Sequence, residues 1–268
     1  MDRLKVGVIG IGDMGANHAR VFSEMPDVEL YALADLNSVR LHDLAGKYGV
    51  EKAYEDYKKV INLEEIDIID ICLPDELHYR PVVESLEAGK HIFLEKPMAA
   101  ELKEAEDMVS MSKEYQTKFM IGYLLRFDPR YVQIKNAIDN GDLGDIIYIV
   151  THRNSPHNQG PRKYRSGTSL TMHVGVHDLD LIHWYLNSEV ESVSAKAVCK
   201  MLSHKNMKDA ASALIRFENS AMASVNYGWV LPEKYPILLD ARLEIVGTKG
   251  AAYVGFQHHD GVVMVKED

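Results

Sequence analysis

The sequence predicts an α/β protein with two domains: an N-terminal doubly wound parallel sheet and a C-terminal α/β domain with a mainly antiparallel open sheet. From residue 4 to about residue 122, short apolar runs alternate with amphipathic helical stretches, whereas closely spaced strands with turn residues between them follow residue 190. Parallel strands need crossover connections and are buried on both faces, so the first pattern predicts a parallel sheet. The predicted domains are residues 1–122 and 123–268.

The first domain contains five predicted strands, each a short apolar run. They are "LKVGVIG" (4–10), "VELYALAD" (28–35), "IDIIDICLP" (66–74), "KHIFLEKP" (90–97) and "KFMIGYLL" (118–125). The segments between them space their apolar residues at helical intervals. These helices are "MGANHARVFSEM" (14–25), "VRLHDLAGKYG" (39–49), "ELHYRPVVESLEAG" (76–89) and "ELKEAEDMVSMSKEY" (101–115). Gly49 and Gly89 stand near helix ends, where glycine commonly terminates a helix.

The second domain begins with a helix from about Pro129 to Ile138 and a turn at "NGDLGD" (140–145). A strand, "IIYIVTHR" (146–153), precedes a long polar loop, "SPHNQGPRKYRSG" (155–167). One more helix is predicted in "SLTMHVGVHDLDLIHW" (169–184). The remaining segments are strands of an antiparallel sheet: "VESVSAKAVCK" (190–200), "AASALIRFEN" (210–219), "AMASVNYGWV" (221–230), "ARLEIVGTKG" (241–250) and "AAYVGF" (251–256).

The composition excludes several classes of partner. The chain has 30 Lys and Arg against 40 Asp and Glu, a net charge of -10, whereas nucleic acids and acidic membranes attract basic surfaces. We therefore expect a small molecule or another protein as partner. Cys72 and Cys199 lie in apolar runs, which predicts buried reduced thiols and a reducing compartment. With neither a signal peptide nor a membrane-spanning run, the sequence predicts a soluble cytoplasmic protein.

A glycine-rich segment follows the first predicted strand and opens the first helix. In "VGVIGIGDMGANHA" (6–19), Gly10, Gly12 and Gly15 have G-x-G-x-x-G spacing. The first glycine permits a tight turn, the second lets the backbone approach a pyrophosphate, and the third allows close packing of helix on strand. The phosphate then binds at the helix N-terminus. Without a cofactor, the same glycines are simply a turn that joins a strand to a helix.

Asp35 makes the dinucleotide interpretation much stronger. It ends the next strand, twenty positions beyond Gly15, where a carboxylate accepts hydrogen bonds from a ribose 2'-hydroxyl. The combination predicts a Rossmann domain that binds NAD, because a carboxylate repels the 2'-phosphate of NADP. Arg40 lies close by and could serve such a phosphate, so NADP remains open.

Four segments match the motifs of a known family. They are "GIGDMGANHAR" (10–20), in which His18 follows the third glycine, "CLPDELHYRPVVESLEAGKHIFLEKPMA" (72–99), "GYLLRFDP" (122–129) and "SGTSLTMHVGVHDLDLIHW" (166–184). The second segment contributes Pro74, His78 and the most specific element, Glu95-Lys96-Pro97. Together they resemble the Gfo/Idh/MocA oxidoreductase family, which includes inositol and sugar dehydrogenases.

This resemblance implies an NAD(P)-dependent dehydrogenase or reductase that acts on CH-OH groups. Hydride would pass between nicotinamide and a polyol, cyclitol, sugar or related hydroxy or keto substrate. The first domain would bind the cofactor. The second would bind substrate and form a homodimer or homotetramer through its sheet. Relatives usually continue through further helical sequence after the last strands, whereas this chain stops at Asp268, a difference expected to affect the edges of the substrate pocket.

Lys96 and two histidines are the candidate catalytic residues. Lys96 follows the apolar run 91–95, so we expect it at the carboxyl edge of the sheet, where it would polarise the substrate oxygen. An isolated Lys beside a turn would instead be a solvated surface residue. Pro97 fixes the backbone after Lys96 and is a candidate for a cis bond. His177 aligns with the family's general acid/base, a role that suits an imidazole near neutral pH.

His173 stands where relatives have an aspartate. At 100 degrees per residue, His173, His177 and Asp180 share one helix face with Trp184 beside it. Two neighbouring imidazoles disfavour double protonation, so His173 would tune His177 or bind substrate. Asp178 and Asp180 are interpreted as surface charges or domain contacts, and His183 as structural or solvated.

The resemblance also implies the binding residues. The expected cofactor contacts are Gly10, Ile11, Gly12, Asp13, Met14, Gly15, Asp35, Leu73, Pro74, His78, Glu95 and Lys96. The expected substrate contacts are Tyr123, Arg126, Asn154, His157, Tyr164, His173 and His177. As an alternative role, Arg126 would pair with Asp128 or touch the nicotinamide side.

Two other functions remain open on the sequence. His173 in place of the aspartate favours a non-catalytic dinucleotide-binding sensor on the same fold. A metal-dependent lyase or hydrolase would use His173 and His177, which have helical ligand spacing. However, the metalloprotease pattern needs Glu at the position of Val174, and only a coincidence of folding would bring His258 and His259 into such a site. We therefore expect no metal.

Overall fold

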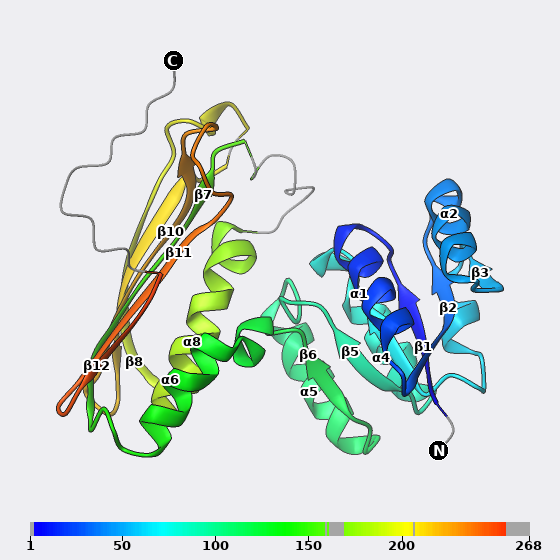
Figure 1. Cartoon of the computed structure of the whole chain (residues 1–268), viewed down its shortest axis with the longest axis horizontal. Helices are drawn as coiled ribbons and strands as arrows, with labels where there is room; N and C mark the ends of the chain where they lie inside the picture. Colours follow the sequence, from blue (N-terminus) through cyan, green and yellow to red (C-terminus); the bar gives the residue numbers. More distant parts are fainter. Residues whose placement is uncertain (1–2, 159, 161–168, 206, 256–268) are drawn as a thin grey trace. The chain divides into compact units, whose positions relative to one another are not determined.

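The computed structural model describes residues 3–158, 160, 169–205 and 207–255. The chain divides into two compact units, which meet in the sequence at Gly122 and Tyr123 (Figure 1). None of the helices in the described ranges is long and apolar enough to cross a membrane.

The first unit contains a six-stranded sheet in the order β3-β2-β1-β4-β5-β6, and every neighbouring pair is parallel. The strands are β1 (Leu4–Ile9), β2 (Val28–Ala34), β3 (Lys52–Tyr54), β4 (Ile68–Ile71), β5 (His91–Leu94) and β6 (Phe119–Ile121). The five predicted strands and the parallel doubly wound sheet are confirmed. The sequence prediction missed β3, because this three-residue edge strand is half-buried throughout and carries no apolar run.

Helices connect these strands. They are α1 (Asp13–Glu24), α2 (Ser38–Tyr48), α3 (Tyr57–Ile61), α4 (Tyr79–Glu87) and α5 (Leu102–Glu114), with a 3-10 turn η1 (Asp75–Leu77) before α4. The five-residue α3 is the helix that periodicity did not reveal, since it is barely longer than one turn. Gly49 and Gly89 adopt left-handed conformations at φ 68° and 69°, as expected of residues that end helices.

Both faces of the parallel sheet are buried, as its continuous apolar runs predict. On one face, Val6 and Val8 of β1 pack with Ala19 of α1 and Leu41 of α2. On the other, Ile9, Ile69 and Ile71 pack with residues of α3, α4 and α5, among them Val60, Val82, Leu86 and Met108. These two layers hold the carboxyl ends of β1, β4 and β5 at one edge of the sheet.

The second unit contains a six-stranded sheet in the order β12-β11-β7-β10-β9-β8. Its strands are β7 (Ile146–Pro156), β8 (Val190–Val198), β9 (Ala210–Phe217), β10 (Met222–Leu231), β11 (Asp240–Gly247) and β12 (Ala251–Val254). The pairing of β7 with β10 is parallel. The pairs β10-β9, β9-β8, β7-β11 and β11-β12 are antiparallel, so the mainly antiparallel open sheet is confirmed.

Helices pack on one face of this sheet (Figure 1). They are η2 (Leu124–Phe127), α6 (Pro129–Asp139), α8 (Val176–Leu186) and, before α8, the π-helical turn η3 (Thr171–Gly175); a short 3-10 turn, η4 (Ser203–Lys205), follows β8. Ile149, Leu181 and Ile245 are among the fully buried core residues between helices and sheet. The predicted helices at 129–138 and 169–184 are therefore present, although the second begins as a π turn.

Strand β8 is exposed at every residue in this single chain. Elsewhere on the sheet, large apolar side chains such as Ile147, Leu214 and Met222 are also exposed. The predicted burial of both thiols is wrong for Cys199, which follows β8 and is exposed, whereas Cys72 is partly buried; both are free cysteines. A run of apolar residues in the sequence does not by itself distinguish a core strand from a strand on an exposed face.

Candidate functional site

The glycine turn between β1 and α1 has the geometry that its three glycines predict. Gly10 has φ 83°, and a Cβ there would lie 2.8 Å from the Cys72 carbonyl oxygen. A Cβ on Gly15 would lie 1.9 Å from the Gly10 oxygen, so only glycine lets α1 pack this closely. At Gly12 the nearest atom to a Cβ is 3.9 Å away, on Arg40. The space beside Gly12 is thus open to a ligand, at a helix N-terminus that has no capping side chain.

Asp35 is held firmly at the end of β2. Its Oδ2 accepts a hydrogen bond from the Ile11 backbone N–H at 2.8 Å, and its Oδ1 accepts one from Asn37 N–H at 2.8 Å. A carboxylate has about four lone-pair positions, so acceptor capacity remains for ribose hydroxyls. Ile11, an expected cofactor contact, has a buried side chain and donates its N–H to Asp35, while Asp13 and Met14 are exposed on the first turn of α1.

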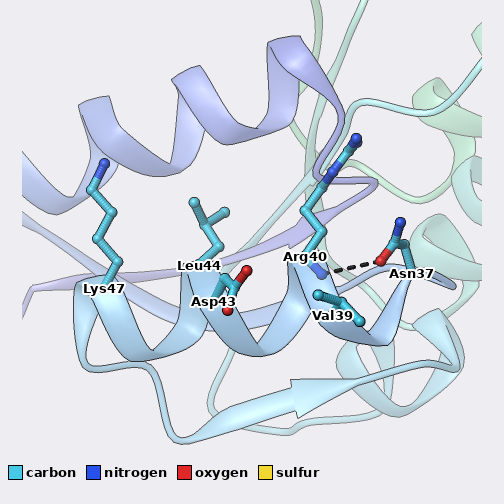
Figure 2. A pocket seen from close by; sticks show the side chains of 6 residues that line it. All are labelled: Asn37, Val39, Arg40, Asp43, Leu44 and Lys47. Atoms are coloured by element: carbon cyan, nitrogen blue, oxygen red, sulfur yellow. Dashed lines mark hydrogen bonds between the residues drawn. The ribbon is translucent and has the colours of Figure 1, made fainter.

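An open hollow of about 490 Å³ lies along α2 and its cap Asn37, whose N–H donates to Asp35. Its lining residues are Asn37, Val39, Arg40, Asp43, Leu44 and Lys47 (Figure 2). Arg40, Leu44 and Lys47 extend to the same side of the helix (Figure 2). Arg40 Nη1 lies 3.5 Å from the Ile11 carbonyl oxygen, so this guanidinium leans toward the glycine turn. A cationic group therefore stands near Asp35, the carboxylate that the sequence predicts to favour NAD over NADP.

The loops that follow β4 and β5 are tied together by His78. This side chain is 1% exposed. Its Nε2 lies 2.8 Å from the Leu73 carbonyl oxygen, and its Nδ1 lies 3.0 Å from the Pro97 carbonyl oxygen. The Lys96-Pro97 peptide bond is cis, the form that the sequence left undecided. His78, an expected cofactor contact, thus links two loops at the sheet edge. One of these loops carries Leu73 and Pro74, which are also expected cofactor contacts.

Lys96 lies two residues beyond the end of β5 and is partly buried. Its backbone N–H donates to Glu95 Oε2 at 3.2 Å, and the Glu95 N–H donates to the Ile71 carbonyl oxygen at the end of β4. Lys96 is therefore at the carboxyl edge of the parallel sheet, where doubly wound folds bind ligands. The glycine turn, Asp35 and Lys96 all belong to the first unit.

Behind this edge is a buried charged cluster that sequence reasoning missed. His18 Nδ1 lies 3.0 Å from Asp70 Oδ2, and His18 Nε2 lies 3.4 Å from Glu95 Oε1. Burial by itself lowers the pKa of His18. The hydrogen bonds that His18 makes with Asp70 and Glu95, together with the negative charges of these residues, outweigh burial and raise the pKa from 6.5 to about 10. The available signal was Asp70, a carboxylate inside the apolar run 66–74, which needs a buried partner.

In the second unit, His173 and His177 belong to different kinds of helix. His173 is in the π turn η3, whereas His177 is the second residue of α8. A π turn has more residues per turn than an α-helix, so the predicted spacing of 100 degrees per residue does not hold across the pair. The His173 ring lies 5.8 Å from that of Trp229 on β10. Both histidines are partly buried, and His183 is exposed, with its Nε2 3.8 Å from Glu189.

Tyr227 on β10 supports the π turn. Its hydroxyl shares a hydrogen bond of 2.8 Å with Thr171 Oγ1. A Cβ on Gly175 would lie 2.8 Å from the Tyr227 ring, so glycine is needed where η3 meets α8. Packing against β10 thus sets the backbone that carries His173. The π turn is the kind of local irregularity that is frequent at functional sites.

The acidic residues of α8 are not free surface charges, contrary to the first of the two sequence interpretations. Asp180 accepts two hydrogen bonds from Arg126, at 2.9 and 2.6 Å. The alternative pairing of Arg126 with Asp128 is wrong, because Asp128 caps α6 and pairs with Arg130. The Arg126 guanidinium also lies 5.8 Å from the ring of Tyr123, so two expected substrate contacts lie together.

The other expected substrate contacts lie on or after β7. Asn154 is partly buried near its end. His157 follows the strand; its N–H donates to the Leu231 carbonyl oxygen at 2.9 Å, and its Nδ1 lies 4.0 Å from Glu233. Tyr164, like His258 and His259, lies outside the described residues.

The first unit, with its open glycine turn, fixed acidic residue and parallel sheet, defines a nucleotide-binding Rossmann protein. Residues 4–123 match the family model described as "Oxidoreductase family, NAD-binding Rossmann fold", and residues 131–253 match the "GFO/IDH/MocA C-terminal domain". The chain belongs to the Gfo/Idh/MocA oxidoreductase family, so the resemblance, the NAD cofactor and the fold class predicted from the sequence are confirmed.

Relatives and solved structures cover nearly all of the chain. An uncharacterized oxidoreductase, YrbE of Bacillus subtilis, is 30% identical over 253 residues, which are 93% of this chain and 73% of the relative. Myo-inositol 2-dehydrogenase of Thermotoga maritima is 28% identical over 98% of this chain and 79% of its own length. The crystal structure of scyllo-inositol dehydrogenase from Lactobacillus casei with bound NAD(H) and scyllo-inositol has a TM-score of 0.88 at 25% identity, and the match covers 98% of this chain and 79% of that one.

Proposed function

We propose that this chain is an NAD-dependent dehydrogenase that acts on a secondary hydroxyl of a cyclitol or related polyol. The observation that carries the proposal is the arrangement of the first unit, in which Lys96 lies at the carboxyl edge of a sheet that also carries the open glycine turn and Asp35. Inositol dehydrogenases among the relatives support the substrate class.

The first unit fits NAD. Gly12 leaves room for backbone to approach a pyrophosphate, and Asp35 retains acceptor capacity for a ribose. A bound NAD would supply the acceptor for hydride from the carbon that bears the substrate hydroxyl. The N–H groups at the start of α1 hold negative charge there, and His78 keeps the two loops beyond β4 and β5 in register.

Three side chains carry the chemistry in this proposal. His177 takes the proton from the substrate hydroxyl, and its imidazole suits proton exchange near neutral pH. Lys96 donates a hydrogen bond to the same oxygen, which offsets the negative charge that develops there. His173 binds the substrate or tunes His177, in the position where relatives have an aspartate. Tyr123, Arg126, Asn154, His157 and Tyr164 complete the proposed substrate contacts.

The exposed face of the second sheet supports a homo-oligomer, either a dimer or a tetramer. Strand β8 is exposed along its whole length, and Ile147, Leu214 and Met222 expose apolar surface on other strands. Apolar patches of this kind mark interaction surfaces. The two free thiols fit a cytoplasmic protein, since reducing conditions preserve them.

The test is a screen of inositols, other polyols and keto-sugars with NAD and with NADP, followed by the absorbance of the reduced nicotinamide. We expect turnover of at least one cyclitol with NAD. Lys96→Ala should lose roughly a hundredfold or more in kcat, because a donor to the developing oxyanion is gone. It should still bind NAD, with a smaller loss of affinity, because Lys96 is also an expected cofactor contact. Lys103→Ala, an exposed lysine of α5, is the matched control and should leave turnover unchanged.

Equal turnover in Lys96→Ala and wild type would contradict the assigned role of Lys96. Tight NAD binding without turnover of any substrate would instead favour a dinucleotide-binding sensor, the alternative that His173 raises. The two results are distinguishable, because the first requires an active wild-type enzyme and the second does not.

A further inference from the structure

The buried cluster in the first unit joins three segments that are far apart in the sequence. His18 is on α1, six residues after Gly12; Asp70 is on β4; and Glu95 directly follows β5. Their side chains are 13%, 0% and 9% exposed, respectively. The His18 ring stacks on Phe93 of β5, with centroids 5.4 Å apart at 17°, which holds the ring in place between the two carboxylates.

The geometry favours a doubly protonated His18 ring. A carboxylate only accepts hydrogen bonds, and here one faces each nitrogen of His18. A neutral imidazole has a single N–H and would turn a lone pair toward one of the two carboxylates. A doubly protonated ring donates toward both carboxylates, and this cation offsets part of the buried negative charge, while burial raises the pKa of Asp70. The raised pKa of His18, about 10, agrees with this conclusion.

Glu95 connects this cation to the lysine. One of its oxygens, Oε1, faces His18, and the other, Oε2, accepts the backbone N–H of Lys96 at 3.2 Å. On a third side, a Cβ added to Gly122 would lie 3.1 Å from Oε1, so glycine at this position leaves the carboxylate its space. The orientation of the Glu95 carboxylate thus depends on His18 and in turn sets where the Lys96 backbone begins.

We infer that His18 is a positioning residue for Lys96. Through Glu95, it links the helix that follows the glycine turn to the peptide that carries the lysine. The importance of this link for turnover rests on the proposed function, whereas the link itself can be measured without turnover. His18 touches neither the proposed substrate nor the reacting atoms in this inference, and its effect passes through Glu95.

Two other interpretations of the cluster are weaker. Cys72 Sγ lies 3.2 Å from His18 Nδ1, as in a nucleophile-histidine pair. However, burial, then the charges of Asp70 and Glu95, raise the pKa of this thiol, which disfavours the reactive thiolate. A metal would use Nδ1 of His18 with Asp70 and Cys72, whose ligand atoms lie within 4.8 Å of one another. That arrangement needs a deprotonated Nδ1, contrary to the donor role that Asp70 requires.

The experiment compares wild type, His18→Asn and Glu95→Gln, with His204→Asn as the control for loss of an exposed histidine. Reductive methylation with 13C-formaldehyde labels the lysines, and Lys96→Arg assigns the Lys96 resonance. We expect this resonance to shift in both cluster variants, and kcat to fall by roughly 10-fold to 100-fold, because a lysine displaced by about 1 Å loses alignment. In His18→Asn, NAD affinity should change less than about threefold, a difference under 1 kcal/mol.

A double variant, His18→Gln with Glu95→Gln, separates positioning from general loss of structure. The two amide side chains can hydrogen-bond to each other without charge, so the double variant should recover part of the kcat lost in Glu95→Gln. An unshifted Lys96 resonance in His18→Asn would overturn the inference, and so would a parallel loss of NAD affinity and kcat. Stoichiometric zinc or iron in the wild type that is lost in Cys72→Ala would overturn it in favour of the metal site.

If the wild type turns over no substrate, the proposed function is wrong. The Lys96 resonance still shows whether His18 positions Lys96 through Glu95. If the wild type is active and the resonance does not respond to His18→Asn, the link fails while the proposed function stands.

Discussion

Arg153 of β7 and Asp178 of α8 form a bidentate ion pair inside the second unit. The Arg153 Nε and Nη2 atoms donate to the carboxylate at 3.0 and 2.8 Å. The two residues are only 5% and 2% exposed. Because Asp178 directly follows His177, this pair fixes the first turn of the helix that carries the candidate acid/base to the strand beneath it.

We predict that Asp178→Ala lowers the free energy of unfolding by about 3–5 kcal/mol, because it leaves the Arg153 guanidinium buried without its partner. Urea unfolding followed by circular dichroism measures the change. Asp139→Ala, which removes an exposed i,i+4 pair with Lys135, is the control and should cost less than about 1 kcal/mol. If both substitutions lower the free energy of unfolding by the same amount, the buried pair stabilises the protein no more than the exposed pair does.

The glycine turn allows stability to be separated from cofactor binding. Gly15→Ala should destabilise the protein by about 1–3 kcal/mol or more, because its Cβ would overlap the Gly10 carbonyl oxygen. Gly12→Ala has room in the protein and should leave the melting temperature nearly unchanged, yet weaken NAD binding by roughly tenfold, about 1.4 kcal/mol.

Thermal unfolding and calorimetric titration with NAD measure the two effects. Gly46→Ala is the control, since nothing lies within 4 Å of a Cβ there. NAD affinity that survives Gly12→Ala would place the pyrophosphate elsewhere.

Cofactor choice should depend on Asp35 and Arg40. We expect Asp35→Ser to raise the ratio of NADP affinity to NAD affinity by roughly tenfold, because it removes the charge that repels a 2'-phosphate and leaves Arg40 available to pair with it. Adding Arg40→Ala to Asp35→Ser should cancel most of the gain. Fluorescence titration with both reduced cofactors measures the ratio. An unchanged ratio in Asp35→Ser would mean that the ribose binds away from this carboxylate.

The pKa of His18 predicts how stability depends on pH. Its folded value, about 10, is above the ordinary 6.5, so the protonated ring stabilises the folded state fully below pH 6.5. This contribution is lost as the pH rises through about 10. The free energy of unfolding of wild type should therefore approach that of His18→Gln between pH 7 and 10, as urea titrations at several pH values would reveal. A gap that stays constant over this range would contradict a charged His18.

Much of the fold follows from local patterns in the sequence. Apolar runs and helical periodicity predict five strands of the parallel sheet and four of its helices, because each pattern reflects burial of neighbouring residues in one element. These patterns do not predict β3 and α3, since three half-buried residues and a five-residue helix have almost no periodicity. Local patterns also do not predict the parallel pairing of β7 with β10, because it joins segments about seventy residues apart in the sequence.

The candidate site divides in the same way. The sequence by itself determined the glycine turn, Asp35 and the position of Lys96 at the sheet edge, because each depends on a strand and the turn that follows it. Only the tertiary structure decided the partners of the charged groups: Asp180 with Arg126 across 54 positions, and His18 with Asp70 across 52. Such pairs form when packing brings distant elements together and excludes water, so that a buried charge must find its opposite, whichever residue the fold brings beside it.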